Sequence, residues 1–211
     1  MQVRWLGTVS YGEALALQRD LVERRRSNEV PDQLVLLEHP HVITLGTGAD
    51  ANHVLLDSAE RRLMGIELFE TGRGGDVTYH GPGQLVGYPI LALEEERQDL
   101  HRYVRDIEDV LIRCLADLGV GAGRKPGLTG VWVDDEKIVA IGVRVSRGWI
   151  TSHCFAFNLS TNLGFIDAIV PCGIREYGVT SLERLTGSVD PEVVRERVVA
   201  RFAEVFGRRV V

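Results

Sequence analysis

The sequence predicts an α+β fold with a mixed β-sheet, folded as one domain over residues 1–211. A chain of 211 residues can bury one sizeable core but is short for two. Short β-branched and aliphatic runs bounded by Gly, Pro and Asp are typical of strands, and three longer stretches carry apolar residues at helical spacing. Helices and strands alternate irregularly along the chain, which favours α+β over a doubly wound fold.

The first predicted helix spans about residues 10–26. Ser10 followed by Glu13 matches the capping-box pattern at a helix start. The apolar residues that recur at helical spacing in this segment are Tyr11, Ala14, Leu15, Leu21 and Val22. Four short runs in the same half of the chain are predicted strands, namely 34–38, 42–45, 66–70 and 85–91.

A second helix is predicted over about residues 99–118, where Gly119 ends it. Cys114 belongs to its apolar stripe, so we expect this thiol in the core. The stripe consists of Leu100, Tyr103, Val104, Ile107, Leu111, Cys114, Leu115 and Leu118. An antiparallel meander is predicted after it, with strands over 130–135, 137–145 and 149–159. The last helix begins at Asp190-Pro191 and ends at Gly207.

Composition excludes several classes of protein and partner. Hydrophobic residues make up 45% of the chain and charged residues 26%, which is typical of a folded globular protein. The net charge of −6 provides no general positive field, so we expect no nucleic-acid partner. No stretch approaches the ~20 apolar residues of a membrane helix, and the start resembles neither a signal nor a transit peptide. We therefore expect a cytoplasmic protein with free thiols and no membrane partner.

The densest cluster of chemistry-bearing residues is the glycine-rich segment 73–84. Four glycines, at 74, 75, 81 and 83, alternate with an arginine, a tyrosine and a histidine. Glycines at such density permit close backbone approach, and Arg73 offers a planar fork for phosphate or carboxylate. The alternative is a glycine-rich turn between strands, with Tyr79 and His80 satisfied locally.

Cys172 is the best candidate for a nucleophile among the three thiols. Cys114 lies on a helix stripe and Cys154 in an alternating strand, whereas Cys172 lies between Pro171 and Gly173 in a predicted turn that would expose it. A nucleophilic thiol has to be accessible and close to a base or cation. The alternative is an inert loop cysteine.

Lys137 is the candidate partner of this thiol. Only Lys125 and Lys137 are lysines among the 24 basic side chains of this arginine-rich chain. A desolvated lysine can cycle between ammonium and amine, whereas a guanidinium is not deprotonated. The alternative is a surface lysine after the acidic run 134–136, and contact with Cys172 would require tertiary folding.

The histidines offer general bases or metal ligands. His39 and His41 flank Pro40 without a cysteine or acidic cluster at zinc spacing, so we expect no metal site. His80 and His153 lie within conspicuous motifs, and their roles stay open at this point.

Several motifs together resemble the octanoyltransferases of lipoate biosynthesis, which move an octanoyl group from acyl carrier protein onto lysines of lipoyl domains. The resemblance spans essentially the whole chain in the expected order. The chain departs from the family at Cys154, where the family usually has glycine. The segments that carry the resemblance are Arg73–Gln84, Lys137–Arg144, His153–Asn158, Pro171–Gly173 and Val179–Leu182.

This resemblance implies the fold of biotin-protein and lipoate-protein ligases, a mixed sheet plus a smaller sheet flanked by helices. It also implies an acyl-thioester on Cys172, with Lys137 as the partner that favours the thiolate. For the histidines, we expect His80 to shape the acyl pocket or to hydrogen-bond the thioester region, and His153 to support the Cys172 turn from an adjacent strand. The residues it assigns to substrate contacts are Arg73, Gly74, Gly75, Asp76, Val77, Thr78, Tyr79, His80, Ala140, Ile141, Gly142, Cys154, Phe155 and Ala156.

The implied partners are octanoyl-acyl carrier protein and the lipoyl domains of 2-oxoacid dehydrogenase E2 subunits and glycine cleavage H protein, with no cofactor and no ATP. An acidic carrier would need a local basic patch, for which Arg124, Lys125, Arg144 and Arg147 are candidates. Three alternatives remain at this point: an ATP-dependent lipoate or biotin ligase, a non-catalytic module that binds the carrier or the lipoyl domain, and a cysteine thioesterase.

Overall fold

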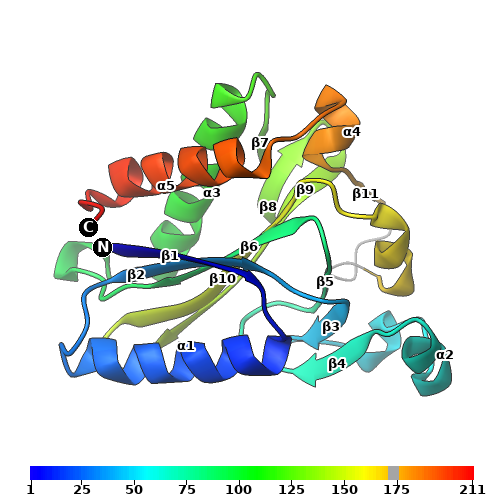
Figure 1. Ribbon diagram of the computed structural model, residues 1–211, viewed down its shortest axis with the longest axis horizontal. Helices are drawn as coiled ribbons and strands as arrows, with labels where there is room; N and C mark the ends of the chain where they lie inside the picture. The colour runs from blue at the N-terminus through cyan, green and yellow to red at the C-terminus, as the bar shows by residue number, and fades with distance from the viewer. Residues whose placement is uncertain (171–175) are drawn as a thin grey trace.

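The computed structural model describes residues 1–170 and 176–211, apart from the side chain of Cys154, and contains two β-sheets with helices around them (Figure 1). The large sheet has the strand order β1-β2-β6-β10-β9-β8-β7, with β11 paired to β9, and the small sheet has the order β4-β3-β5. The strands of the large sheet are β1 (Gln2–Thr8), β2 (Gln33–Glu38), β6 (Gln84–Ile90), β7 (Gly123–Lys125), β8 (Leu128–Val133), β9 (Glu136–Ser146), β10 (Ile150–Asn158) and β11 (Gly178–Val179). Those of the small sheet are β3 (Val42–Leu45), β4 (Glu67–Glu70) and β5 (Val77–His80).

Helices cover both faces of the large sheet. Figure 1 shows α1 on one face, and α3 and α5 on the other. The α-helices are α1 (Tyr11–Arg26), α2 (Ser58–Leu63), α3 (Leu100–Asp117), α4 (Leu182–Thr186) and α5 (Pro191–Phe206). Short 3-10 helices are η1 (Ala51–His53), η2 (Glu95–Arg97) and η3 (Leu163–Ala168). No helix in the described part of the chain is long and apolar enough to cross a membrane.

The continuous apolar run of β2 is explained by burial on both faces of the sheet. Side chains of a strand alternate between the two faces. Leu34 and Leu36 join the core under α3 and α5, whereas Val35 and Leu37 join the core under α1. A strand covered on both sides therefore has no polar face, and the sheet carries one hydrophobic core on each side.

The mixed α+β fold and the three long helices predicted from the sequence are confirmed. Ser10 accepts the N–H of Glu13 at the start of α1, while Asp190 and Gly207 cap α5. Cys114 is fully buried in α3, and burial raises the pKa of its thiol to about 12. The meander is confirmed as β8-β9-β10, whereas the sequence does not predict β1, β5, β7, β11, α2, α4 or the 3-10 helices.

The two sheets are joined by the Gly81-Pro82-Gly83 turn between β5 and β6. Gly83 has a φ of +76°, and a Cβ there would lie 2.7 Å from the Ser160 hydroxyl oxygen. Its carbonyl accepts the N–H groups of Leu159 and Ser160. The expected close approach of glycine backbone is thus confirmed at the joint between the sheets.

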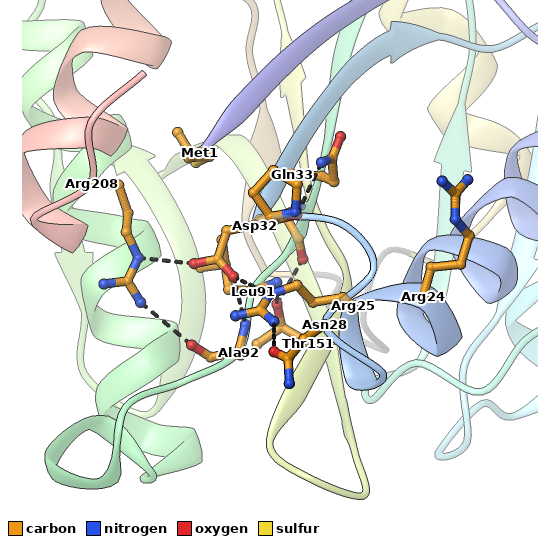
Figure 2. A network of polar contacts seen from close by, with 12 residues as sticks. Met1, Arg24, Arg25, Asn28, Asp32, Gln33, Leu91, Ala92, Thr151 and Arg208 are labelled. Atoms are coloured by element: carbon orange, nitrogen blue, oxygen red, sulfur yellow. Dashed lines mark hydrogen bonds and ion pairs between the residues drawn. The ribbon is translucent and has the colours of Figure 1, made fainter. Parts of the chain in front are cut away.

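Asp32 fastens the C-terminal tail to the start of the fold (Figure 2). Its Oδ1 accepts from Arg25 Nε at 2.7 Å and from the Ala92 N–H at 3.0 Å, and its Oδ2 accepts from Arg208 Nε at 2.9 Å. The carboxylate is nearly buried, so each of these bonds is shielded from water. One side chain therefore links α1, the segment after β6 and the residues after α5.

We expect Asp32→Ala to lower the free energy of unfolding by about 2–4 kcal/mol, because two arginines and a backbone N–H lose a buried charged acceptor. Urea denaturation followed by circular dichroism measures this loss. The control is Asp20→Ala, which removes an exposed ion pair with Arg24 and should cost at most about 0.5 kcal/mol. Equal losses in the two variants would contradict the role of Asp32.

Candidate active site

Two narrow cavities lie side by side where the small sheet meets β9 and β10. They share three lining residues, Thr78, Ala140 and Ala156. The first, the histidine cavity, has a volume of about 20 Å³ and is lined by Tyr11, Arg73, Thr78, His80, Val86, Tyr88, Ala140, Ile141, Gly142, His153, Phe155 and Ala156. The second, the lysine cavity, has a volume of about 40 Å³ and is lined by Val77, Thr78, Tyr79, Gln84, Lys137, Ala140, Ala156, Asn158, Ile166, Ile169 and Val179.

Arg73 holds the glycine-rich loop against the small sheet. Its buried guanidinium donates from Nη2 to the backbone oxygen and the hydroxyl of Thr44, at 2.8 and 2.9 Å, and from Nη1 to the Gly74 carbonyl at 3.1 Å. A Cβ at Gly142 would lie 3.0 Å from Arg73 Cδ and 3.1 Å from the Gly74 oxygen. Gly142 therefore lets this loop approach β9, where the Gly74 N–H donates to the Val143 carbonyl.

A chain of buried amides sets the proton position on His80. Asn158 Nδ2 donates to the Thr180 carbonyl, so Asn158 Oδ1 faces Gln84 Nε2 as an acceptor at 3.0 Å. Gln84 Nε2 also donates to the Tyr79 carbonyl, which leaves Gln84 Oε1 to accept from His80 Nδ1 at 2.8 Å. His80 consequently carries its proton on Nδ1, and its Nε2 keeps a lone pair.

The histidines around this cavity are neutral. Burial lowers the pKa of His80 to about 3, with a further contribution from His39. Burial also lowers the pKa of His39 and of His153 to about 4, and for His153 the guanidinium of Arg73 adds to the effect. His39 Nδ1 donates to the Val9 carbonyl, so its Nε2 accepts from the Tyr88 hydroxyl, each at 2.7 Å. Burial raises the pKa of that hydroxyl, which keeps its proton.

Lys137 is buried near the start of β9 rather than displayed on the surface. Its side chain is 6% exposed, and its Nζ lies 4.8 Å from the centre of the Trp132 ring. Val179 of β11 pairs with Lys137 in register, and the Thr180 N–H donates to the Lys137 carbonyl at 3.0 Å. The scarcity of lysine in this arginine-rich sequence predicts that the Lys137 side chain is desolvated, and its burial confirms this prediction.

Cys172 lies outside the described residues, but the chain on either side of residues 171–175 reaches the lysine cavity. Ile169 and Val179 both line that cavity together with Lys137. Val170 donates its N–H to the His53 carbonyl, and Gly178 donates to the Asp135 carbonyl. These bonds hold Val170 next to η1 and Gly178 next to the β8–β9 turn.

Most residues predicted to contact substrate line these two cavities or an adjoining groove. Gly74 and Gly75 border that groove, which Lys137 also lines. Asp76 lines none of them: its carboxylate accepts the Asp50 N–H at 3.1 Å and lies 2.5 Å from His53 Nδ1, so it holds η1 instead. Cys154 contributes backbone opposite Gly142 in the β9–β10 pair.

His153 lies far from Lys137 along the sheet. It pairs with Val143, six residues beyond Lys137 on β9, which is about 20 Å at ~3.3 Å per residue. Its φ of +55° is unusual for a side-chain-bearing residue, and its N–H donates to Gln18 Oε1 at 2.8 Å. Support of the Cys172 turn by His153 stays a prediction, and this separation does not favour it.

The sequence did not single out Tyr11, Tyr88, Gln84 or Asn158 as site residues. Gln84 and Asn158 are the last residues of two motifs that carry the family resemblance, so these motifs could have identified them as site residues. Tyr11 and Tyr88 reach the histidine cavity from α1 and β6 through tertiary packing, for which no local pattern exists. Residues 1–170 and 176–211 contain no group of three or more His, Cys, Asp or Glu arranged to hold a metal ion.

The neutral histidines should make stability depend on pH. The pKa values of about 4, 3 and 4 lie below the 6.5 of an unfolded histidine, so the unfolded chain binds more protons between pH 4 and 6.5. The free energy of unfolding should therefore fall as pH falls through this range, by up to about 1.4 kcal/mol per pH unit for each histidine.

Urea denaturation at several pH values between 7 and 5 measures this slope. His80→Gln should reduce the slope by about one proton relative to the unaltered protein. An unaltered slope in His80→Gln would show that His80 binds protons as readily in the folded protein as in the unfolded chain, which contradicts its lowered pKa.

Solved structures confirm the fold. A bi-partite lipoate protein ligase from Thermoplasma acidophilum superposes with a TM-score of 0.72 at 17% identity, over 100% of this chain and 88% of that one. The biotin protein ligase from Aquifex aeolicus gives a TM-score of 0.55 at 14% identity, over 98% of this chain and 69% of that one. Both likenesses confirm the combination of a large mixed sheet and a small sheet.

Sequence relatives establish the family. The model of the lipoyl protein ligase A/B catalytic domain matches residues 10–203. The octanoyltransferase of Rubrobacter xylanophilus is 54% identical over 203 residues, which are 95% of this chain and 91% of that one. The octanoyltransferase of Gloeobacter violaceus is 52% identical over 202 residues, 95% of this chain and 88% of that one. The chain therefore belongs to the octanoyltransferases of the lipoyl protein ligase A/B catalytic domain family.

Proposed function

We propose that this octanoyltransferase takes the octanoyl group from octanoyl-acyl carrier protein and passes it, through a thioester on Cys172, to the lysine of a lipoyl domain. The observation that carries this proposal is the burial of Lys137 in a cavity lined by residues on both sides of the segment containing Cys172. A base for a nucleophilic thiol has to lie close to the thiol, in a place with little water. The burial of Lys137 provides the place with little water. Ile169 and Val179, which line the same cavity on either side of the segment with Cys172, support the closeness of the two residues.

The first half-reaction forms the acyl-enzyme. The Lys137 amine accepts the proton of the Cys172 thiol, and the thiolate attacks the carbonyl carbon of the octanoyl thioester. The carbon–sulfur bond to the carrier then breaks, and the leaving thiolate takes the proton back from the Lys137 ammonium. One thioester replaces another, so the step is nearly balanced in energy and requires no ATP.

The second half-reaction forms the amide. The neutral amine of the lipoyl-domain lysine attacks the Cys172 thioester, and Lys137 accepts the proton that the attacking nitrogen loses. The Cys172 thiolate leaves and is reprotonated by Lys137, which returns the enzyme to its starting state. Because an amide is more stable than a thioester, this step proceeds downhill.

The acyl chain would lie along the two cavities, with its carbonyl near Lys137 and its tail towards His80. Ala140 and Ala156 pair directly across β9 and β10, and their small side chains line both cavities. Burial of the methylenes at ~0.8 kcal/mol each would contribute roughly 5 kcal/mol and disfavour much shorter chains.

The ATP-dependent ligases share this fold, so the fold alone does not separate the two activities. Identity of 54% and 52% with octanoyltransferases favours transfer. Octanoyl transfer from the carrier without ATP separates the two activities directly.

Replacement of Lys137 by arginine tests its role as a base, because arginine keeps the positive charge but does not accept a proton. We expect Cys172 to remain open to alkylation, while transfer to the lipoyl-domain lysine falls at least ~100-fold. Separate assays of acyl-enzyme formation and amide formation measure the two steps. Near-normal amide formation by a folded Lys137→Arg variant would eliminate Lys137 as the base.

Cys172→Ala should abolish transfer while circular dichroism stays unchanged. Cys154→Gly is the matched thiol control, since it restores the residue usual in the family and should keep activity near that of the unaltered enzyme. Retention of about a tenth of the activity by Cys172→Ala would move the nucleophile to another thiol, with Cys154 the first candidate.

A further inference from the structure

An open groove of about 420 Å³ adjoins the lysine cavity at the start of β9. It lies between the first turns of α3, the β7–β8 turn and the glycine-rich loop, and it has no role in the transfer steps described above. Its volume falls within the range of small-molecule and cofactor sites. Its lining consists of Gly74, Gly75, Leu100, His101, Val104, Arg105, Gly127, Leu128, Thr129, Lys137, Ile141, Gly142 and Val143.

The charged side chains of this groove have one sign. Arg105 is cationic, Lys137 becomes cationic when it takes the thiol proton in the proposed reaction, and the described residues that line the groove include no carboxylate. Behind it, the fully buried Glu108 accepts from Arg105 at 2.6 Å and from Arg124 at 2.8 Å, so two guanidiniums share one carboxylate. This cluster keeps a net positive charge on a chain whose overall charge is −6. The groove is therefore suited to an anionic group.

The other lining residues suit a slender, partly apolar chain. Leu100, at 45% exposure, Val104 and Leu128 provide apolar surface, while Gly127 and the Gly74-Gly75 loop bring backbone close to the groove. Lys137 lines both the groove and the lysine cavity. A chain lying in the groove can thus end at the residue proposed to move the proton.

We propose that this groove binds the phosphopantetheine arm of the acyl donor, with the phosphate near Arg105 and His101 and the thioester end at Lys137. This inference rests on the proposed function, because it assigns the groove to the donor of that reaction. A carrier arm joins an anionic phosphate to a chain of amides and apolar carbon, which matches the charge and surface of the groove. The acceptor lysine is a cation before it reacts, so the same positive lining disfavours it.

Thr129 is the position at which this proposal is best tested. It is exposed in β8, lines the groove and has no part in the proposed transfer steps. Thr129→Glu introduces a negative charge, and Thr129→Gln provides a side chain of nearly the same size without charge. Gln2→Glu, on β1 at the opposite edge of the sheet, makes the same change in total charge far from the groove.

The donors are octanoyl-phosphopantetheine and octanoyl-pantetheine, which differ only in the phosphate. We expect Thr129→Glu to raise the KM for the phosphorylated donor about fivefold relative to Thr129→Gln. The KM for the dephosphorylated donor and that for the lipoyl domain should differ little between these two variants. Gln2→Glu should match the unaltered enzyme with every substrate.

Two results would overturn the proposal: equal KM values for the phosphorylated donor in both Thr129 variants, or a change confined to the KM for the lipoyl domain. Calorimetric titration with phosphopantetheine itself gives a readout independent of turnover, and its affinity should also fall about fivefold in Thr129→Glu. If no enzyme transfers octanoyl groups but the difference in phosphopantetheine affinity is measured, the proposed reaction is contradicted and the assignment of the groove is supported. If transfer proceeds without any such difference, only the groove assignment fails.

Discussion

Gln84 is buried where the small sheet meets the large one, and the hydrogen bonds that its amide requires organise both cavities. A buried amide left without partners would cost free energy comparable to the bonds it lacks. Its Nε2 is satisfied by the Tyr79 carbonyl and Asn158, and its Oε1 by His80. Asn158 extends the chain to the Thr180 carbonyl, and the Thr180 N–H donates to the Lys137 carbonyl. A single buried side chain thus links the proton position on His80 to the backbone that holds β11 beside Lys137.

The histidine cavity is lined by uncharged histidines and by the guanidinium of Arg73, which donates to Thr44 and Gly74. Around the histidine cavity, burial keeps His39, His80 and His153 uncharged, which suits an alkyl chain. Arg105 and Lys137 border the groove, which is open to solvent and shares Ile141 and Gly142 with the histidine cavity. In the proposed reaction the apolar acyl tail of the thioester lies in the cavities and the anionic carrier arm lies in the groove. The reacting carbon then lies between them at Lys137. Asp32, Arg25 and Arg208 line neither the two cavities nor the groove.

Local signals explain which parts of the structure could be predicted from the sequence. The apolar stripe of α3 and the Asp190 and Gly207 caps of α5 lie within or directly beside the helices that they predict, and both helices are found there. The sequence predicts no strand over Val77–His80, because the pairing of β5 with β3 depends on residues more than thirty positions away. The site follows the same rule: the motifs supplied most cavity residues, and the scarcity of lysine indicated the burial of Lys137. Tertiary packing alone brings Lys137 into contact with Trp132 and places Tyr11 and Tyr88 at the histidine cavity.

The covalent intermediate on Cys172 is the central claim, and intact-mass spectrometry tests it most directly. The unaltered enzyme is mixed with octanoyl-acyl carrier protein in the absence of ATP and acceptor, and the product is digested to locate the modified residue. We expect one octanoyl group per chain, located on Cys172, and its loss with matching octanoylation of a lipoyl domain added afterwards. Octanoylation of the lipoyl domain without any acyl-enzyme, or a requirement for ATP, would contradict the mechanism.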